Sequence, residues 1–261
     1  MVALPLVGVA VVLAAFEAAP RLGVLPRSSF PPTSEVLGTV WSLLGTAEPW
    51  TALGRTLGAW ARAIGWAAVV GVPLGLAMGA SRPGALLCRF TVEFLRPIPA
   101  VALIPVLVLV YGPDASLTVA LGAFAAAFPL LLQAMYGVAD VDPVATDTSR
   151  AYGLGRLDHV RYVVLPSCAP YLATGLRISA SVALILVVTG EYVVGVPGLG
   201  QEVLVAQRSG AYDRAYAWAL LTGLLGLAVN VAFQALERRY LRWYRREGRP
   251  VDRRGRLAVA P

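Results

Sequence analysis

Residues able to do covalent or metal chemistry are scarce in this chain of 261 residues. It has one His (His159), two Cys (Cys88 and Cys168) and no Lys. A phosphate-binding Walker loop needs a Lys after its glycines, and a Schiff base needs a Lys amine. A Cys/His zinc site needs four such ligands, and no Gly-x-Ser-x-Gly nucleophile elbow occurs. We therefore expect no enzyme activity, no metal site and no cofactor held by this chain.

The most distinctive polar stretch is Asp147-Thr148-Ser149-Arg150-Ala151-Tyr152-Gly153, followed ten residues later by Val163-Val164-Leu165-Pro166. It lies between a charge-free run, 115–139, and a largely apolar run, 178–196. A polar island punctuated by Gly and Pro between two such runs is more structured than a simple connector. We interpret it as the place where the protein meets an energy source.

Helix signals in this stretch predict two short helices. Asp142 is a good N-cap, and Pro143 suits the first helical position, so a helix is expected over 143–152. Gly153 and Gly155 are expected to end it with a left-handed turn. A second helix is expected over 157–164, stopping before Pro166. The pair would form a compact knob; an amphipathic re-entry loop without a partner is the alternative.

The elements that position this knob are predicted from composition. The chain is 57% hydrophobic and 14% charged, with a mean hydropathy of +0.69, whereas soluble domains are about 25% charged. A span needs roughly 20 apolar residues. The prediction is an all-α membrane protein with about six transmembrane helices, over 2–19, 60–80, 97–112, 115–138, 172–196 and 216–236. The third contains Pro97, Pro99 and Pro105, so it is expected to be bent or partly re-entrant inside the bundle.

Arginines orient the chain. Many of them follow the last apolar segment, which places the C-terminus in the cytoplasm by the positive-inside rule. The loops at 81–96 and 139–171 then lie inside as well. The net charge of +7 is explained by this pattern, without a nucleic-acid partner. The first segment has basic residues only after it, which would favour the opposite orientation. A full span that later helices overrule, a partial span and a cleaved signal peptide all stay open.

Three regions are expected along the chain: an N-terminal helix with an external amphipathic segment (1–58), a core with its polar loop at 140–166 (59–240), and an Arg-rich cytoplasmic tail (241–261). In the first region, Thr33 or Ser34 is predicted to cap a helix beginning near Glu35. That helix would lie at the outer membrane surface or pack on the bundle.

The polar stretch resembles the EAA loop of ABC-importer permeases, Glu-Ala-Ala-x3-Gly-x9-Ile-x-Leu-Pro. Gly153, Leu165 and Pro166 match it, Val163 is a close substitute, and the triplet reads Asp-Thr-Ser here. Flanking stretches resemble the nitrate/sulfonate/taurine branch: Phe94-Leu95-Arg96-Pro97-Ile98-Pro99, and Gly190-Glu191-Tyr192 with Pro197-Gly198-Leu199-Gly200.

This resemblance implies a type I ABC importer permease in the plasma membrane of a prokaryote. Its knob would be a coupling helix on a separate ATPase pair, which would hold ATP and Mg. A second permease copy, as a homodimer, and an extracytoplasmic binding protein are the other implied partners, and the substrate would be a small anion such as an alkylsulfonate, taurine or nitrate. The implied ATPase-coupling residues are Asp147, Thr148, Ser149, Arg150, Gly153, Leu154, Gly155, Val163, Leu165 and Pro166.

Pore or gate residues are predicted at Glu191, Tyr192, Ser179, Gln133, Pro99 and Pro105. An acid within a membrane span indicates function, and pairing with an Arg is the alternative for Glu191. Hydrogen bonding between helices is the alternative for Ser179 and Gln133. Two other classes of protein stay open: an ion-coupled secondary transporter, which usually shows repeats with broken helices, and a membrane anchor that transports nothing.

Overall fold

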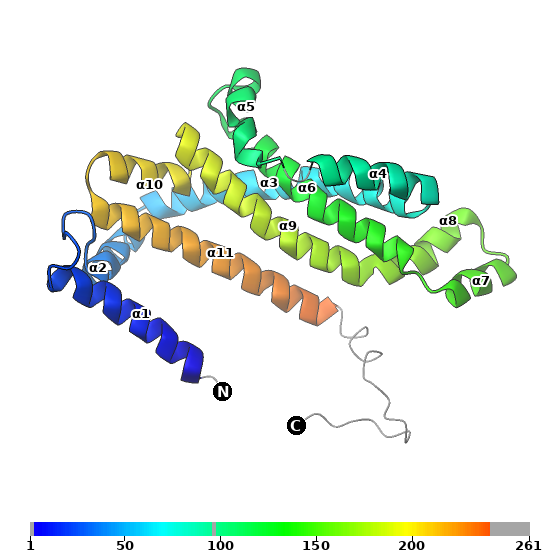
Figure 1. Ribbon diagram of the computed structural model, residues 1–261, viewed down its shortest axis with the longest axis horizontal. Helices are drawn as coiled ribbons and strands as arrows, with labels where there is room; N and C mark the ends of the chain where they lie inside the picture. The colour runs from blue at the N-terminus through cyan, green and yellow to red at the C-terminus, as the bar shows by residue number, and fades with distance from the viewer. Residues whose placement is uncertain (1–2, 96–97, 241–261) are drawn as a thin grey trace. The chain divides into compact units, whose positions relative to one another are not determined.

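The computed structural model describes residues 3–95 and 98–240, and every regular element within these ranges is helical (Figure 1). The predicted Arg-rich tail, 241–261, lies outside them, as do Pro97 of the predicted third span and Arg96 of the predicted loop 81–96. The helices are α1 (Ala3–Arg21), α2 (Thr33–Leu44), α3 (Glu48–Gly79), α4 (Arg82–Leu95), η1 (Ala100–Leu103), α5 (Ile104–Tyr111), α6 (Ala115–Ala139), α7 (Pro143–Ala151), α8 (Arg156–His159), η2 (Val160–Val164), α9 (Leu165–Val194), α10 (Leu199–Arg208) and α11 (Tyr212–Tyr240).

Four stretches of the described residues are helical, long and apolar enough to cross a membrane: Glu48–Gly79, Ala115–Ala139, Arg156–Arg208 and Tyr212–Arg239. The apolar stretch Ala100–Tyr111 is shorter, and a re-entrant course for it stays a prediction. Helix α1 has 19 residues, close to the roughly 20 of a full span. The all-helical membrane fold is confirmed, and the count of six spans stays a prediction.

Two helices differ from the sequence-based boundaries. Helix α3 begins at Glu48 and runs for 32 residues, so the predicted span 60–80 is only its C-terminal part. Pro49 follows in the first turn, where a missing N–H leaves no hydrogen bond unmade. Helix α4 occupies most of the predicted loop 81–96, because Ser81 accepts a hydrogen bond from the Gly84 N–H and so caps its start.

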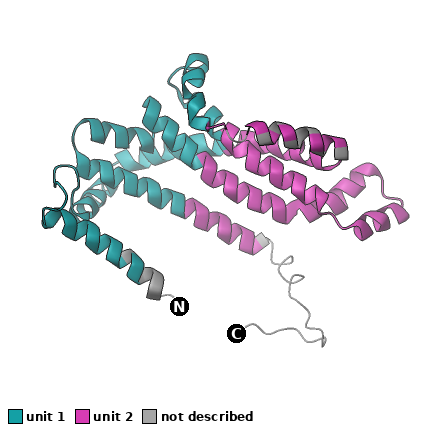
Figure 2. Ribbon diagram, in the orientation of Figure 1, with its two compact units in different colours: residues 1–63, 100–122, 184–227 teal, residues 64–99, 123–183, 228–261 magenta. Residues whose placement is uncertain are grey.

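The chain divides into two compact units, each built from several separate segments (Figure 2). Unit 1 comprises residues 1–63, 100–122 and 184–227, and unit 2 comprises residues 64–99, 123–183 and 228–261. In unit 1 the buried core is formed by α2, the start of α3, α10 and α11, with Trp218 as its largest side chain. Helix α2 contributes Val36, Val40 and Leu43 to this core. The alternative that this helix packs on the bundle is therefore correct for one of its faces.

Small residues set the packing in unit 2. A Cβ added at Gly71, Gly75 or Gly79 would lie 2.8, 2.3 or 2.7 Å from a backbone carbonyl oxygen of α6. Such distances are shorter than a carbon–oxygen contact allows, so the two helices approach this closely only because these positions carry no side chain. These three glycines form a row of small residues on α3. Membrane helices associate through close packing of this kind, because lipid provides no hydrophobic driving force between them.

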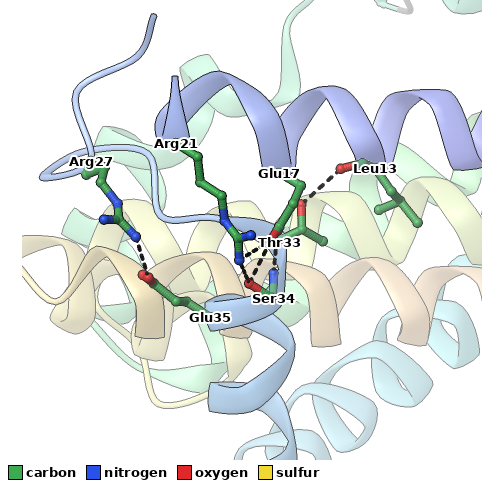
Figure 3. Close-up of polar contacts among 7 residues, drawn as sticks. All are labelled: Leu13, Glu17, Arg21, Arg27, Thr33, Ser34 and Glu35. Atoms are coloured by element: carbon green, nitrogen blue, oxygen red, sulfur yellow. Dashed lines mark hydrogen bonds and ion pairs between the residues drawn. The ribbon is translucent and has the colours of Figure 1, made fainter. Parts of the chain in front are cut away.

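A carboxylate from α1 fixes the start of α2 (Figure 3). Glu17 accepts hydrogen bonds from the backbone N–H and the hydroxyl of Ser34, both at 2.9 Å, and pairs with Arg21 at 2.5 Å. The N-cap position itself is Pro32, so the prediction that Thr33 or Ser34 caps this helix was wrong. A free N–H at the helix start is instead satisfied by a side chain 17 residues earlier in the sequence.

Candidate functional site

The knob predicted from the polar stretch is present in unit 2. Helix α7 begins at Pro143 and ends at Ala151, one residue before the predicted end. The side chain of Asp142 accepts a hydrogen bond from the Val144 N–H at 2.8 Å, which confirms its capping role. Capping by Asp and the fixed φ angle of Pro143 set the start of this helix locally.

A tight corner follows α7. Gly153 has φ +71°, the left-handed conformation that glycine adopts without strain, as predicted. Its N–H donates to the Arg150 carbonyl at 2.9 Å, and the Leu154 N–H donates to the Ser149 carbonyl at 3.0 Å. Gly155 was predicted to share the left-handed turn, and this was wrong. It has φ −64° and ψ 165°, an extended conformation that starts the next helix.

The chain then passes into the membrane span without a break. Helix α8 covers only Arg156–His159, a π turn covers Val160–Val164, and α9 begins at Leu165. The predicted stop before Pro166 was therefore wrong. The π turn widens the hydrogen-bond ladder just ahead of Pro166, so the missing N–H of this proline does not end the helix.

The surface of the knob combines polar and apolar side chains. Asp147 and Arg150 are both exposed and form an ion pair at 3.4 Å, which contributes little to stability in water. Thr148 donates to the Val144 carbonyl at 2.7 Å. Tyr152 and Leu157 are each 81% exposed, and Val144 is exposed as well. Of the other predicted coupling residues, Leu165 and Pro166 are exposed, and Val163 and Leu154 are half-buried.

One side chain of α7 is buried. Ser149 is 5% exposed, and its hydroxyl lies 2.7 Å from the Thr146 carbonyl oxygen and 2.7 Å from Nδ1 of His159. The partner of His159 is thus a side chain of the preceding helix. Ser149 and His159 together connect α7 to α8 across the glycine corner.

A cavity of about 510 Å³ lies beside this contact, also in unit 2. Its walls are the C-terminal ends of α3 and α6 together with Val160 and Val164, and they are mostly apolar. Thr146 and His159 contribute its polar part. The knob is therefore not backed by a fully packed layer of side chains on this side.

The predicted pore residues in unit 2 make helix–helix contacts. Ser179 is fully buried and donates a hydrogen bond to the Ala126 carbonyl of α6 at 2.7 Å. Gln133 is half-buried, and its Cβ packs against Gly175, where an added Cβ would lie 2.9 Å away. The Ser179 contact is the hydrogen bond between helices expected as the alternative to a pore role, and the Gln133 contact is close packing. A role in the pore stays a prediction for both residues.

In unit 1, Glu191 lies at a buried polar junction. It is 1% exposed, and one of its carboxylate oxygens accepts from the Thr56 hydroxyl and from the Gly200 N–H, both at 3.0 Å. The Thr56 oxygen in turn accepts from the Leu199 N–H at 2.9 Å. We call these four residues the Glu191 junction. It satisfies the first two N–H groups of α10, which would otherwise be buried without partners.

Gly198 makes room for this junction. A Cβ at Gly198 would lie 2.2 Å from the Glu191 carboxyl carbon, and a Cβ at Gly200 would lie 2.3 Å from the Val188 carbonyl oxygen. The Gly-Leu-Gly turn is therefore required by close approach between the start of α10 and the end of α9. The contacts of Glu191 are to a hydroxyl and a backbone N–H, and among the described residues no ion pair joins it to an Arg.

The other predicted pore residues have simpler surroundings. The Tyr192 hydroxyl donates to the side-chain oxygen of Gln207 in α10. Pro99 is exposed, and Pro105 is exposed in the first turn of α5. No group of three or more His, Cys, Asp or Glu side chains in the described part of the chain is placed to hold a metal ion.

Sequence reasoning missed Thr56 and the hydrogen bond between Ser149 and His159. Thr56 gave no signal, because a single hydroxyl in a long apolar helix is common and its partner is 135 residues away. The pairing of Ser149 with His159 was available in principle, since both lie within one short loop. Finding it required the direction of the chain after Gly153, which the left-handed turn determines.

Comparison with known proteins agrees with the resemblance seen in the loop. Residues 71–242 match the family model described as "Binding-protein-dependent transport system inner membrane component". The aliphatic sulfonates transport permease named SsuC, from Escherichia coli (strain K12), is 29% identical over 240 residues, which cover 89% of this chain and 88% of SsuC.

Two further relatives carry different substrates in their names. The taurine transport system permease protein TauC of Escherichia coli (strain K12) is 27% identical, covering 90% of this chain and 87% of TauC. The nitrate import permease protein NrtB of Leptolyngbya laminosa is 26% identical, covering 63% of this chain and 59% of NrtB.

A solved structure shows the same fold. A chain of the MetNI methionine ABC transporter in an inward-facing conformation aligns with a TM-score of 0.62 at 22% identity, covering 76% of this chain and 95% of that chain. The match to the family model spans more than half of the sequence and contains the whole knob. The chain therefore belongs to the family of binding-protein-dependent transport system inner membrane components, the permease subunits of ABC importers.

Proposed function

We propose that α7 is the coupling helix of this permease, and that it docks on a separate ATPase which supplies the energy for import. The observation that carries the proposal is the exposure of Val144, Tyr152 and Leu157 on the knob. Large apolar side chains gathered on one small projection are typical of a protein-binding surface. The Asp142 cap and the glycine corner give this surface a defined shape.

A second copy of the chain completes the pore in this proposal. Helix α5 with η1 covers only Ala100–Tyr111, too short to cross a hydrocarbon layer of about 30 Å. Irregular backbone at membrane depth must be covered by protein or face water. Leu109 is 87% exposed in the single chain, and Val106 and Val110 are exposed as well. We assign α5 to the contact between the two copies of a homodimer.

The substrate is a small anion in this proposal, of the sulfonate, taurine or nitrate type. The support is that three relatives carry aliphatic sulfonates, taurine and nitrate in their names. An extracytoplasmic binding protein delivers it. The C-terminus lies in the cytoplasm, because Arg238 and Arg239 lie in the last turn of α11 and the sequence beyond them is rich in Arg.

Affinity copurification in mild detergent tests the coupling site. The tagged permease is coexpressed with candidate ATPase subunits from the same genome, as wild type, as Leu157→Asp and as Val24→Asp. Leu157 and Val24 are both highly exposed apolar residues, but Val24 lies outside the knob. We expect wild type and Val24→Asp to retain an ATPase and Leu157→Asp to lose it. Equal recovery with all three proteins, or no ATPase with wild type, contradicts the proposal.

A further inference from the structure

The attachment of α7 to the rest of unit 2 depends on few contacts. Ser149 is the one buried residue of this helix, and the others are exposed or half-buried. The cavity of about 510 Å³ beside it is lined by residues of the α3 and α6 ends. Because protein interiors are normally close-packed, a helix next to such a space can shift into it unless something holds it.

The Ser149–His159 contact is well placed to hold it. The hydroxyl of Ser149 has one proton, which it donates to the Thr146 carbonyl oxygen. Nδ1 of His159 lies 2.7 Å from the same hydroxyl. Since the hydroxyl proton is directed to Thr146, we assign Nδ1 as the donor of the second hydrogen bond, which places the ring proton on Nδ1. The contact joins residues ten positions apart, on either side of the glycine corner.

His159 also lies at the point where the knob becomes a membrane helix. It is the last residue of α8, and the π turn that leads into α9 begins with the next residue. A π turn is a local irregularity in the helical ladder and is frequent at functional positions. Without a tie at His159, the corner at Gly153 and this π turn are two places where a displacement of α7 can be absorbed.

We propose that the Ser149–His159 hydrogen bond is a clasp that makes α7 and α8 move as one body with the start of α9. His159 is then a positioning residue for coupling. Through its hydrogen bond, a displacement of α7 moves α9 as well, whereas without it α7 would shift into the neighbouring cavity alone. This inference rests on the proposed docking of α7 on an ATPase. It adds a residue that touches neither ATP nor substrate.

Four variants isolate the hydrogen bond. In His159→Asn the side-chain nitrogen takes the place of Nδ1, two bonds from Cβ, so the donor is kept. In His159→Gln the donor lies one bond further out. His159→Ala and Ser149→Ala each remove one partner. The complex of permease, ATPase and binding protein is reconstituted in proteoliposomes, and substrate moved per ATP hydrolysed is measured for each variant.

We expect this ratio to fall by about three- to tenfold in the Ala and Gln variants, the range that one neutral hydrogen bond provides. His159→Asn should keep most of the wild-type ratio. Equal ratios for Asn and Gln, or a wild-type ratio in His159→Ala, overturn the proposal. Copurification of the ATPase is measured in parallel: if wild type itself retains no ATPase, the proposed function fails, whereas retention with an unchanged ratio means that only the clasp fails.

A second measurement reads the hydrogen bond itself. His159 is the only histidine in the sequence, so histidine labelled with ¹⁵N reports on this ring alone. We expect the nitrogen shifts to show the proton on Nδ1 in the wild type and a mixed tautomer in Ser149→Ala. Nitrogen shifts of a mixed tautomer in the wild type, or shifts that do not change in Ser149→Ala, contradict the clasp, whatever the transport ratios are.

Discussion

Thr56 on α3 donates a hydrogen bond to the carboxylate of Glu191 on α9, with 3.0 Å between the two oxygens. Both side chains are fully buried, and the same carboxylate oxygen accepts from the Gly200 N–H of α10. The presence of an acidic residue in the apolar helix α9 is thus explained, because Glu191 provides an acceptor for a backbone N–H at the start of α10. In unit 1 the Glu191 junction fixes α3, α9 and α10 to one another.

Glu191→Ala should lower the free energy of unfolding by about 2 to 4 kcal/mol, because it leaves the Thr56 hydroxyl and the Gly200 N–H buried without an acceptor. Glu191→Gln keeps a carbonyl oxygen at the same place and should lose less than about 1.5 kcal/mol. Denaturant unfolding of the purified protein in detergent measures both. An Ala variant as stable as the wild type would show that the junction does not hold these helices.

Gly200→Ala should lower the free energy of unfolding by about 1 to 3 kcal/mol, since its Cβ would lie 2.3 Å from the Val188 carbonyl oxygen. Gly223→Ala in α11 is the matched control. No atom lies within 4 Å of the Cβ added there, so this variant should be as stable as wild type or gain about 0.5 to 1 kcal/mol. Thermal unfolding of both variants is the measurement, and equal midpoints would refute the close approach.

Gly153→Ala should weaken ATPase retention more than Gly153→Asn. Gly153 has φ +71°, where Ala is strained by about 1 to 2 kcal/mol and Asn is better tolerated. No atom surrounds the position within 4 Å, so added volume has no effect of its own. Quantitative copurification of the ATPase with each variant gives the order. If Asn weakens retention as much as Ala does, backbone conformation is not what matters at this corner.

A single Cys at Leu109 should form a covalent dimer with a short bifunctional maleimide, in a variant that lacks Cys88 and Cys168. Leu109 is exposed on α5, the helix assigned to the contact between two copies. A single Cys at Leu227 on α11, which is also exposed, should stay monomeric under the same conditions. Gel mobility after denaturation distinguishes the two results. Equal crosslinking at both positions would remove the support for α5 as the interface.

Sequence signals that act over a few residues predicted the knob well. Asp142 and Pro143 set the start of α7, and Gly153 set its end, because capping and left-handed glycine are properties of the local backbone. The prediction for Gly155 was wrong because glycine permits the left-handed conformation without requiring it. The predicted stop before Pro166 failed because the π turn, which no composition signal marks, precedes it.

Contacts between distant parts of the chain were not available from one sequence. The cap on α2 comes from Glu17 in another helix, and the partners of Glu191 come from α3 and α10. A polar residue in an apolar segment indicated only that some partner must exist. Which hydroxyl or N–H supplies it depends on how helices pack, and small residues such as Gly198 decide that.

Uptake into proteoliposomes that contain the permease with its ATPase tests the central claim most directly. The binding protein and labelled taurine, an alkylsulfonate or nitrate are supplied on one side, and ATP on the other. We predict uptake that requires both ATP and the binding protein and that persists when ionophores abolish every ion gradient. Uptake that follows an imposed ion gradient without ATP would contradict the account and identify an ion-coupled carrier.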